Sequence, residues 1–418
     1  MNANSTVNFA SLLHCKTGIN ILAKVILNNE PSVTTLDLSD FHISEVNICR
    51  LAAALKNNTI LQSITLRGVT EVSARAIGDM LVSNRGLHVL ALDCCNAMGS
   101  GGFEALMQGL VQNNTLTTIS LASITLASIS LDRTMHEGSE LRYVSDMLEA
   151  NRTLKHLCLT GNELSRAEDF YKLAASLAIN QGLVRLDLNY CELQTFQVEE
   201  LFKMLEENHS LELLALDCNG IDADIAESFG KLLRCNMTLL SISISHNCVG
   251  SRTAAVVAKA LLENTSLLTL KMDNNEIDDV GALAFSQDLP LMKGLRELSL
   301  HQNTMTSVGG KALIAAMQQS RTLTSLGMQG SAFEFTPRME HEIEFYKRRN
   351  ETAWQVLECA PLKETLWPRV LATSSSDPSM LYFFINQSPA MVSQANVRGN
   401  DAQGEPNANH NSDLRAPI

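Results

Sequence analysis

Four segments in the second half of the chain share one pattern: residues 211–219 read LELLALDCN, 239–247 read LLSISISHN, 267–275 read LLTLKMDNN, and 295–303 read LRELSLHQN. Each segment has apolar residues at its first, fourth and sixth positions and Asn at its ninth. Side chains two residues apart lie on the same face of a β-strand. The segments therefore predict short strands that each bury one face.

The pattern occurs eleven times along the chain. Its first apolar position recurs at residues 33, 61, 87, 116, 154, 183, 211, 239, 267, 295 and 323, and eight of the ten steps are 28 or 29 residues. The remainder of each unit has helical spacing, as in Val198, Leu201, Phe202 and Leu205. A strand and a helix of this size bury their apolar faces only when copies stack. We therefore predict an α/β solenoid, a curved horseshoe with a parallel β-sheet on its concave side and helices on its convex side.

The motif resembles that of leucine-rich repeat proteins, and the 28-residue step with its helical second half is similar to the ribonuclease-inhibitor-like subtype. The resemblance covers eleven repeats, residues 33–332. Such proteins are horseshoe-shaped binders of other proteins, so the resemblance implies a protein partner without identifying it.

The ninth position of each repeat, counted from its first apolar residue, has a predicted structural role. An Asn or Cys there can hydrogen-bond the neighbouring turn, so we interpret Cys95 and Cys191 as buried ladder residues and not as nucleophiles. Phe41, Val69, Ile124 and Ser331 occupy this position in other repeats. The ladder should be weakest at those turns.

Nine Asn-x-Ser or Asn-x-Thr sequences occur in the chain. Six of them, at residues 57, 113, 151, 208, 236 and 264, precede the first apolar residue of a repeat by three or four residues. We interpret them as a signature of the helix-to-strand turn and not as glycosylation sites.

Three regions depart from the repeat. Residues 1–32 are predicted to be a degenerate N-terminal capping repeat, and the long step from 116 to 154 contains about ten extra residues within 121–140, either a binding element or a tolerated surface loop. Residues 333–392 are rich in aromatic residues and predict a mainly helical C-terminal extension, either a cap on the last repeat or a separate docking module. Lys347, Arg348 and Arg349 are expected on the solvent-exposed face of its first helix, and residues 393–418 are expected to be disordered.

Composition disfavours several classes of function. The formal charge is −13, which argues against nucleic-acid binding. No transmembrane or targeting segment is visible, and the ten cysteines form no CxxC pair, so we expect a cytoplasmic protein without disulfides or a metal site. The glycine-rich residues 99–102 lack the Lys-Ser or Lys-Thr of a phosphate loop. No cofactor, small-molecule substrate or membrane partner is predicted.

The outward strand positions form the concave face and hold the candidate binding residues. These are Asp93, Lys155, Arg185, Asp187, Tyr190, Asp217, His246, Lys271, Asp273, Arg296 and His301. Tyr190 is the only aromatic residue on this face, and interface hot spots favour Trp, Tyr and Arg. We therefore expect distributed polar contacts with a partner; an ordinary solvated face without a ligand is the alternative.

Ser245, Asp273 and His301 occupy one position in successive repeats and are expected on neighbouring strands, roughly 4.8 Å apart. A hydrolytic triad needs His between the nucleophile and the carboxylate, whereas here Asp is in the middle. We therefore predict a solvated polar ladder and no catalytic residues.

The sequence as a whole predicts a non-enzymatic protein–protein interaction scaffold that binds through its concave face or its C-terminal module. Charge reversal at Asp217 and Asp273 together should weaken partner binding and leave thermal unfolding nearly unchanged. One alternative is a GTPase-activating protein resembling the activator of the GTPase Ran, although the long acidic tail usual in those proteins is missing. Another alternative is a secreted effector that acts on a host protein.

Overall fold

A computed structural model describes residues 18–95, 97–122, 140–164 and 167–351. The chain divides into two compact units, Met1–Asn350 and Glu351–Ile418, and only Glu351 of the second is described. The expectations for residues 1–17, for Ile124 and the insertion at 123–139, and for the chain beyond Glu351, including the tail 393–418, lie outside the described residues.

The described part of the first unit contains one eleven-stranded parallel sheet in which the strands follow chain order. The strands are β1 Thr35–Asp37, β2 Ser63–Arg67, β3 Val89–Asp93, β4 Thr118–Ser120, β5 His156–Cys158, β6 Arg185–Asp187, β7 Leu213–Ala215, β8 Ser241–Ser243, β9 Thr269–Lys271, β10 Glu297–Ser299 and β11 Ser325–Gly327. Equivalent residues of adjacent repeats pair across the sheet, for example Leu186 with Leu214 and Leu214 with Ile242. The predicted solenoid of parallel strands is confirmed.

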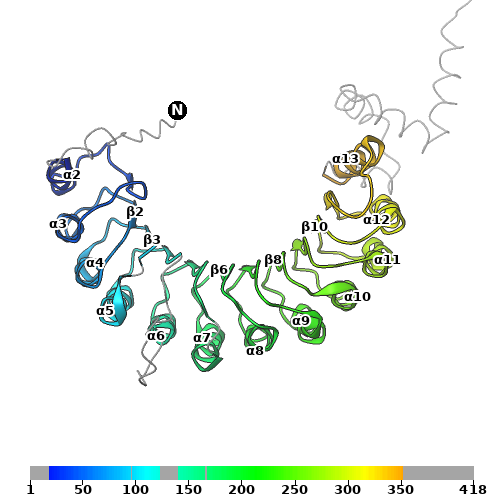
Figure 1. Cartoon of the computed structure of the whole chain (residues 1–418), viewed down its shortest axis with the longest axis horizontal. Coiled ribbons are helices and arrows are strands. Elements are labelled where there is room, and N and C mark those ends of the chain that lie inside the picture. Colours follow the sequence, from blue (N-terminus) through cyan, green and yellow to red (C-terminus); the bar gives the residue numbers. More distant parts are fainter. Residues whose placement is uncertain (1–17, 96, 123–139, 165–166, 352–418) are drawn as a thin grey trace, which may run out of the picture. The chain divides into compact units, whose positions relative to one another are not determined.

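Each strand from β1 to β10 is followed by a helix that returns the chain to the start of the next strand, while one further helix precedes β1 and another follows β11. The helices are α2 Gly18–Leu27, α3 Glu45–Leu55, α4 Glu71–Ser83, α5 Gly99–Gln112, α6 Leu141–Ala150, α7 Ala167–Ile179, α8 Thr195–Leu205, α9 Ala226–Cys235, α10 Gly250–Ala260, α11 Asp279–Asp288, α12 Ser307–Gln319 and α13 Pro337–Glu351, with short 3-10 turns at Ala223–Ile225 and Leu289–Leu291. Within Gly18–Glu351 the strands line the inner side of an arc and the helices its outer side (Figure 1).

One continuous core fills the space between the sheet and the helices. The leucines at the fourth and sixth positions are almost completely buried, as Leu186 and Leu188 show. Each helix adds large apolar side chains, and the rings of Phe202 and Phe229 from adjacent repeats lie 5.1 Å apart, centre to centre. Stacking therefore buries the faces that no single repeat could bury alone.

A row of buried asparagines holds the helix-to-strand turns together. Asn236 is representative: its Nδ2 donates to the carbonyl of Leu205 in the preceding repeat at 2.8 Å, and its Oδ1 accepts from the backbone N–H of Leu239 at 2.9 Å. Equivalent residues are Asn58, Asn84, Asn113, Asn151, Asn180, Asn208 and Asn264. Five of the six predicted turn asparagines belong to this row; in the first turn Asn58 takes the place of Asn57.

The row ends where Met292 and Ser320 occupy the turn position, and α13 supplies the donors for the last turn. Arg349 is only 7% exposed and donates to the carbonyls of Gln318 and Ser320, both at 2.8 Å. Asn350 donates to the carbonyl of Leu323 at 2.6 Å. The prediction that Arg349 lies on a solvent-exposed helix face was wrong, because its guanidinium is buried against these carbonyls and donates hydrogen bonds to them.

Candidate functional site

The ninth-position residues form a second hydrogen-bonded row at the end of the strands. Asn247 is representative: its Oδ1 accepts from the N–H groups of Asn219 and Ile221 at 3.1 and 3.3 Å. Its Nδ2 donates to the carbonyls of Leu216 and Ile244 at 3.1 and 3.0 Å. Because this row fixes each turn to the next, it sets where the exposed strand side chains lie.

Cysteine replaces Asn in this row as expected, and three of the four predicted interruptions, at Phe41, Val69 and Ser331, lie within the described residues. Cys191 Sγ donates to the carbonyl of Leu159 at 3.2 Å. Phe41 and Val69 bring no polar side-chain atom to their turns, and the buried hydroxyl of Ser331 has no partner among the described residues. A hollow of about 370 Å³ lies at the first of these turns, lined in part by Phe41, Arg67 and Cys94.

We expect the two ladder thiols to be unreactive in the folded protein. Burial raises the pKa of Cys95 to about 11 and that of Cys191 to about 12, so at pH 8 only about one part in 10³ to 10⁴ is thiolate. Iodoacetamide followed by peptide mass spectrometry should modify the exposed Cys235 and Cys248 and reach Cys95 and Cys191 only after denaturation. Modification of Cys191 as fast as Cys248 would show that this turn opens readily.

The seventh-position residues form a polar ladder on the inner face. Asn189 Oδ1 accepts from the N–H of Asp217 at 2.6 Å, and Asp217 Oδ1 accepts from the N–H of Ser245 at 2.7 Å. Ser245 Oγ accepts from the N–H of Asp273, and Asp273 Oδ1 accepts from the N–H of His301 at 2.8 Å. The predicted ladder is confirmed, although Ser245 is buried and not solvated.

This ladder changes the interpretation of Asp217 and Asp273. Each carboxylate also accepts a hydrogen bond from a strand hydroxyl, Ser243 Oγ for Asp217 and Ser299 Oγ for Asp273, both at 2.5 Å. Charge reversal would break these contacts, so the expectation that it leaves unfolding unchanged no longer holds. Neither aspartate is suited to a test of binding.

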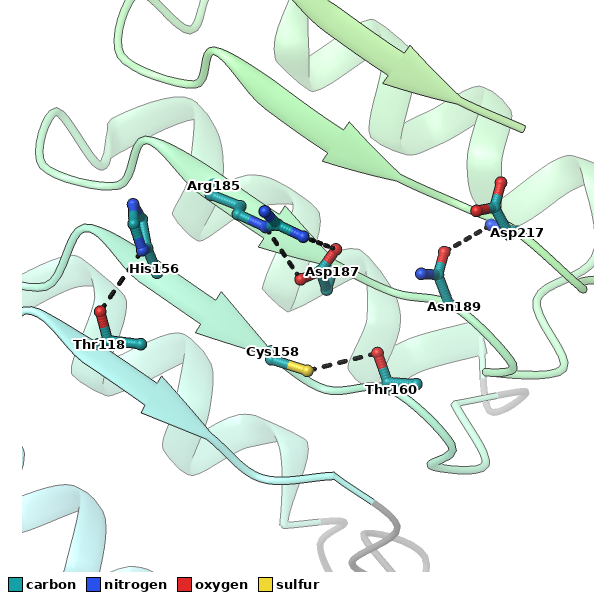
Figure 2. Close-up of polar contacts among 8 residues, drawn as sticks. All are labelled: Thr118, His156, Cys158, Thr160, Arg185, Asp187, Asn189 and Asp217. Atoms are coloured by element: carbon teal, nitrogen blue, oxygen red, sulfur yellow. Dashed lines mark hydrogen bonds and ion pairs between the residues drawn. The ribbon is translucent and has the colours of Figure 1, made fainter. Parts of the chain in front are cut away.

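The inner face between β4 and β7 carries a set of local polar contacts (Figure 2). Arg185 Nε lies 3.1 Å from Asp187 Oδ2, and the Arg185 side chain remains 49% exposed. His156 Nδ1 lies 3.4 Å from Thr118 Oγ1, and Lys155 Nζ donates to the carbonyl of Gly182 at 3.0 Å. The region is a polar surface whose charges are held in place by their neighbours.

The other candidate residues are spread along the sheet. Lys271 Nζ lies 3.9 Å from Glu297, a residue that the sequence analysis did not select, and His246 Nδ1 lies 3.0 Å from Nδ2 of Asn274, which was also missed. Asp93 ends β3, three strands away from Asp187 on β6, and Arg296 directly precedes β10. The predicted residues therefore do not form a compact site. Most of them lie along the sheet, whereas Tyr190 and His246, which were predicted at strand positions, lie beyond the ends of β6 and β8.

The eighth-position residues turn the chain out of the strands with an unusual backbone conformation. In nine repeats φ lies between 49° and 75°, at Gly68, Cys94, Gly161, Tyr190, Cys218, His246, Asn274, Gln302 and Gly330. Residues other than glycine enter this left-handed region at a cost of roughly 1 kcal/mol or more, least for Asn. Tyr190, one of the residues in this conformation, is 62% exposed.

The described residues contain no group of three or more His, Cys, Asp or Glu side chains placed to hold a metal ion. None of the described helices combines the length and apolar composition needed to cross a bilayer.

Comparisons with known proteins give one family model and several partial similarities. A family model described as "Leucine Rich repeat" matches residues 263–286. The chain is 26% identical over 209 residues to the mouse centrosomal protein of 78 kDa, covering 47% of this chain and 26% of that protein. It is also 26% identical to human NACHT, LRR and PYD domains-containing protein 5, covering 49% of this chain and 16% of that protein.

A solved structure titled "Crystal structure of TLR13-ssRNA13 complex" has 17% sequence identity and a TM-score of 0.45, and the match covers 73% of this chain and 41% of that one. The chain spans only about a quarter or less of the two curated relatives. The repeated motif, the parallel sheet and the family model identify this chain as a leucine-rich repeat protein.

Proposed function

We propose that this protein is a non-enzymatic scaffold that binds a partner protein on the inner sheet face, centred on β5–β7. The observation that carries the proposal is a continuous strand face, between β1 and β11, that none of the described helices covers (Figure 1). Ten strand intervals of roughly 4.8 Å give a face about 48 Å long. This length is ample for a standard interface of about 800 Å² per partner.

The chemistry of the face supports recognition through many polar contacts. His156, Arg185 and Lys155 are exposed and oriented by local partners, which reduces the entropy that binding would otherwise cost. The packing of residues 337–351 favours the sheet, and not a C-terminal docking module, as the binding surface, because α13 packs Met339 and Arg349 against the last repeat. The net charge of −13 makes a protein a better partner than nucleic acid.

Site-specific photo-crosslinking in a cell extract tests which face binds. A photo-reactive amino acid at His156 on β5 should capture a partner, and the same group at Lys231 on the outer helix α9 should not. Charge reversal by Lys155→Glu with Arg185→Glu should reduce capture at least tenfold. Unfolding should shift by less than about 1 kcal/mol, because exposed pairs contribute little. Equal capture from both positions, or full capture by the double variant, would contradict the proposal.

The Ran-activator alternative makes a different prediction. Stimulation of single-turnover GTP hydrolysis in a panel of small GTPases would replace the scaffold proposal with an activating function. For the secreted-effector alternative, the partner would be captured from a host extract and not from the extract of the cell that makes the protein.

A further inference from the structure

The edge of the sheet where the chain leaves β6 to β10 keeps side chains at positions that favour glycine. Tyr190, Cys218, His246, Asn274 and Gln302 follow one another in five successive repeats, all with φ between 49° and 58°. Glycine occupies the same position just before and just after this run, at Gly161 and Gly330. The turn itself therefore works with glycine, so its left-handed backbone does not require the five side chains.

These side chains face solvent and not the core. Tyr190, His246, Asn274 and Gln302 are exposed, and Cys218 is half-buried. Two residues further along the chain, Glu192 and Glu276 are also exposed and also left-handed, with φ of 54° and 60°. We call these seven residues the loop edge.

The charged residues of this region are all acidic. The eighth to twelfth positions of the five repeats contain Glu192, Asp222, Glu276 and Asp278 and no Lys or Arg. The Cys218 thiol, and to a smaller extent the Asp217 carboxylate, raises the pKa of Tyr190, and the exposed Glu192 follows the exposed Tyr190 by two residues in the same turn. An aromatic ring beside a carboxylate suits a cationic side chain.

We propose that the loop edge binds an extended segment of a partner protein that carries Lys or Arg side chains. The inference rests on the proposed protein-binding function and adds the chemistry of the partner. Four repeat intervals span roughly 19 Å at the sheet, which about six extended residues cover. Glu192 and Glu276 pair with the cations, Tyr190 stacks on one of them, and the carboxamides of Asn274 and Gln302 bond the segment's backbone.

Fluorescence anisotropy with a labelled ten-residue peptide of alternating Lys and Thr tests this proposal, with a Glu–Thr peptide as the charge control. The full chain should bind the Lys–Thr peptide and not the Glu–Thr peptide. Combining Tyr190→Gly, His246→Gly and Gln302→Gly should weaken binding at least tenfold while the unfolding midpoint stays the same or rises, because glycine relieves the left-handed backbone. A side chain needed only for folding would lower that midpoint instead.

Two further variants serve as matched controls. Cys94→Gly changes a residue of the same conformation outside the loop edge, and it should leave peptide affinity unchanged. Glu192→Gln with Glu276→Gln keeps the side-chain shape, and it should reduce both the affinity and its salt dependence.

Wild-type affinity in the triple-glycine variant, or equal binding of both peptides, would overturn the inference. These results separate it from the proposed function. Partner capture from His156 without binding of the Lys–Thr peptide removes the loop-edge proposal alone. Peptide binding that is lost in the triple-glycine variant, without capture from His156, supports the loop edge and removes the sheet face.

Discussion

Replacing Asn247 with Ala is expected to lower the free energy of unfolding by about 3 kcal/mol. The substitution removes a carboxamide that is bonded on both sides. The N–H groups of Asn219 and Ile221 lose their acceptor, and the carbonyls of Leu216 and Ile244 lose a donor. Because Asn247 is only 5% exposed, water cannot easily replace these contacts.

Urea denaturation measures the loss, and hydrogen exchange locates it. The amides of Asn219 and Ile221 should exchange faster in Asn247→Ala, while those near β2 should not change. Asn247→Cys is the matched control, because Cys191 shows that a thiol can donate at this position, so its loss should be smaller. A change below about 0.5 kcal/mol in the Ala variant would mean that the row contributes little.

The second large effect is expected at the end of the array, where Arg349→Ala should also cost about 3 kcal/mol. Its guanidinium donates to the carbonyls of Met317, Gln318 and Ser320 and lies 5.3 Å from the ring centre of Tyr346. Removing it leaves the last turn without these donors and detaches part of α13. Hydrogen exchange should increase in α12 and α13, and urea denaturation should give the total loss.

The neighbouring arginine provides the control for this variant. Arg348 is exposed and pairs with Glu344 at 3.0 Å on the same helix, so Arg348→Ala should change the stability by less than about 1 kcal/mol. If both variants lose the same free energy of unfolding, the loss comes from removing a charge from α13 and not from removing the buried hydrogen bonds.

The strand register could be predicted from sequence because one spacing determines it. Once Leu186 and Leu214 are recognised as the same repeat position, their pairing follows. The role of Arg349 could not be predicted from its own neighbourhood, where it is one of three consecutive basic residues. The available signal lay about 30 residues earlier in the chain, where Ser320 stands at the turn position in place of the asparagine found in earlier repeats. The backbone carbonyls of that turn therefore needed another hydrogen-bond donor.

The sequence predicts which residues lie on the outward side of the strands, but not which way their side chains turn. Period-two alternation places Asp217 and Asp273 among the outward residues, and they are indeed half-exposed. Alternation does not reveal that each strand ends two residues earlier, at Ala215 and Lys271. The seventh-position N–H groups then lack sheet partners, and the carboxylates turn toward the backbone to accept from them.

Between Asn208 and Asn275 both asparagine rows repeat the same bonds from one repeat to the next, and this regularity bears on how such a gene can change. Adding or removing one whole 28-residue unit in this part of the array recreates these bonds across the new junction, because the residues on either side are already the right ones. A change of another size alters the spacing between equivalent positions and does not reproduce the same bonds. Unequal recombination can therefore lengthen or shorten the array in whole repeats without inventing a new core.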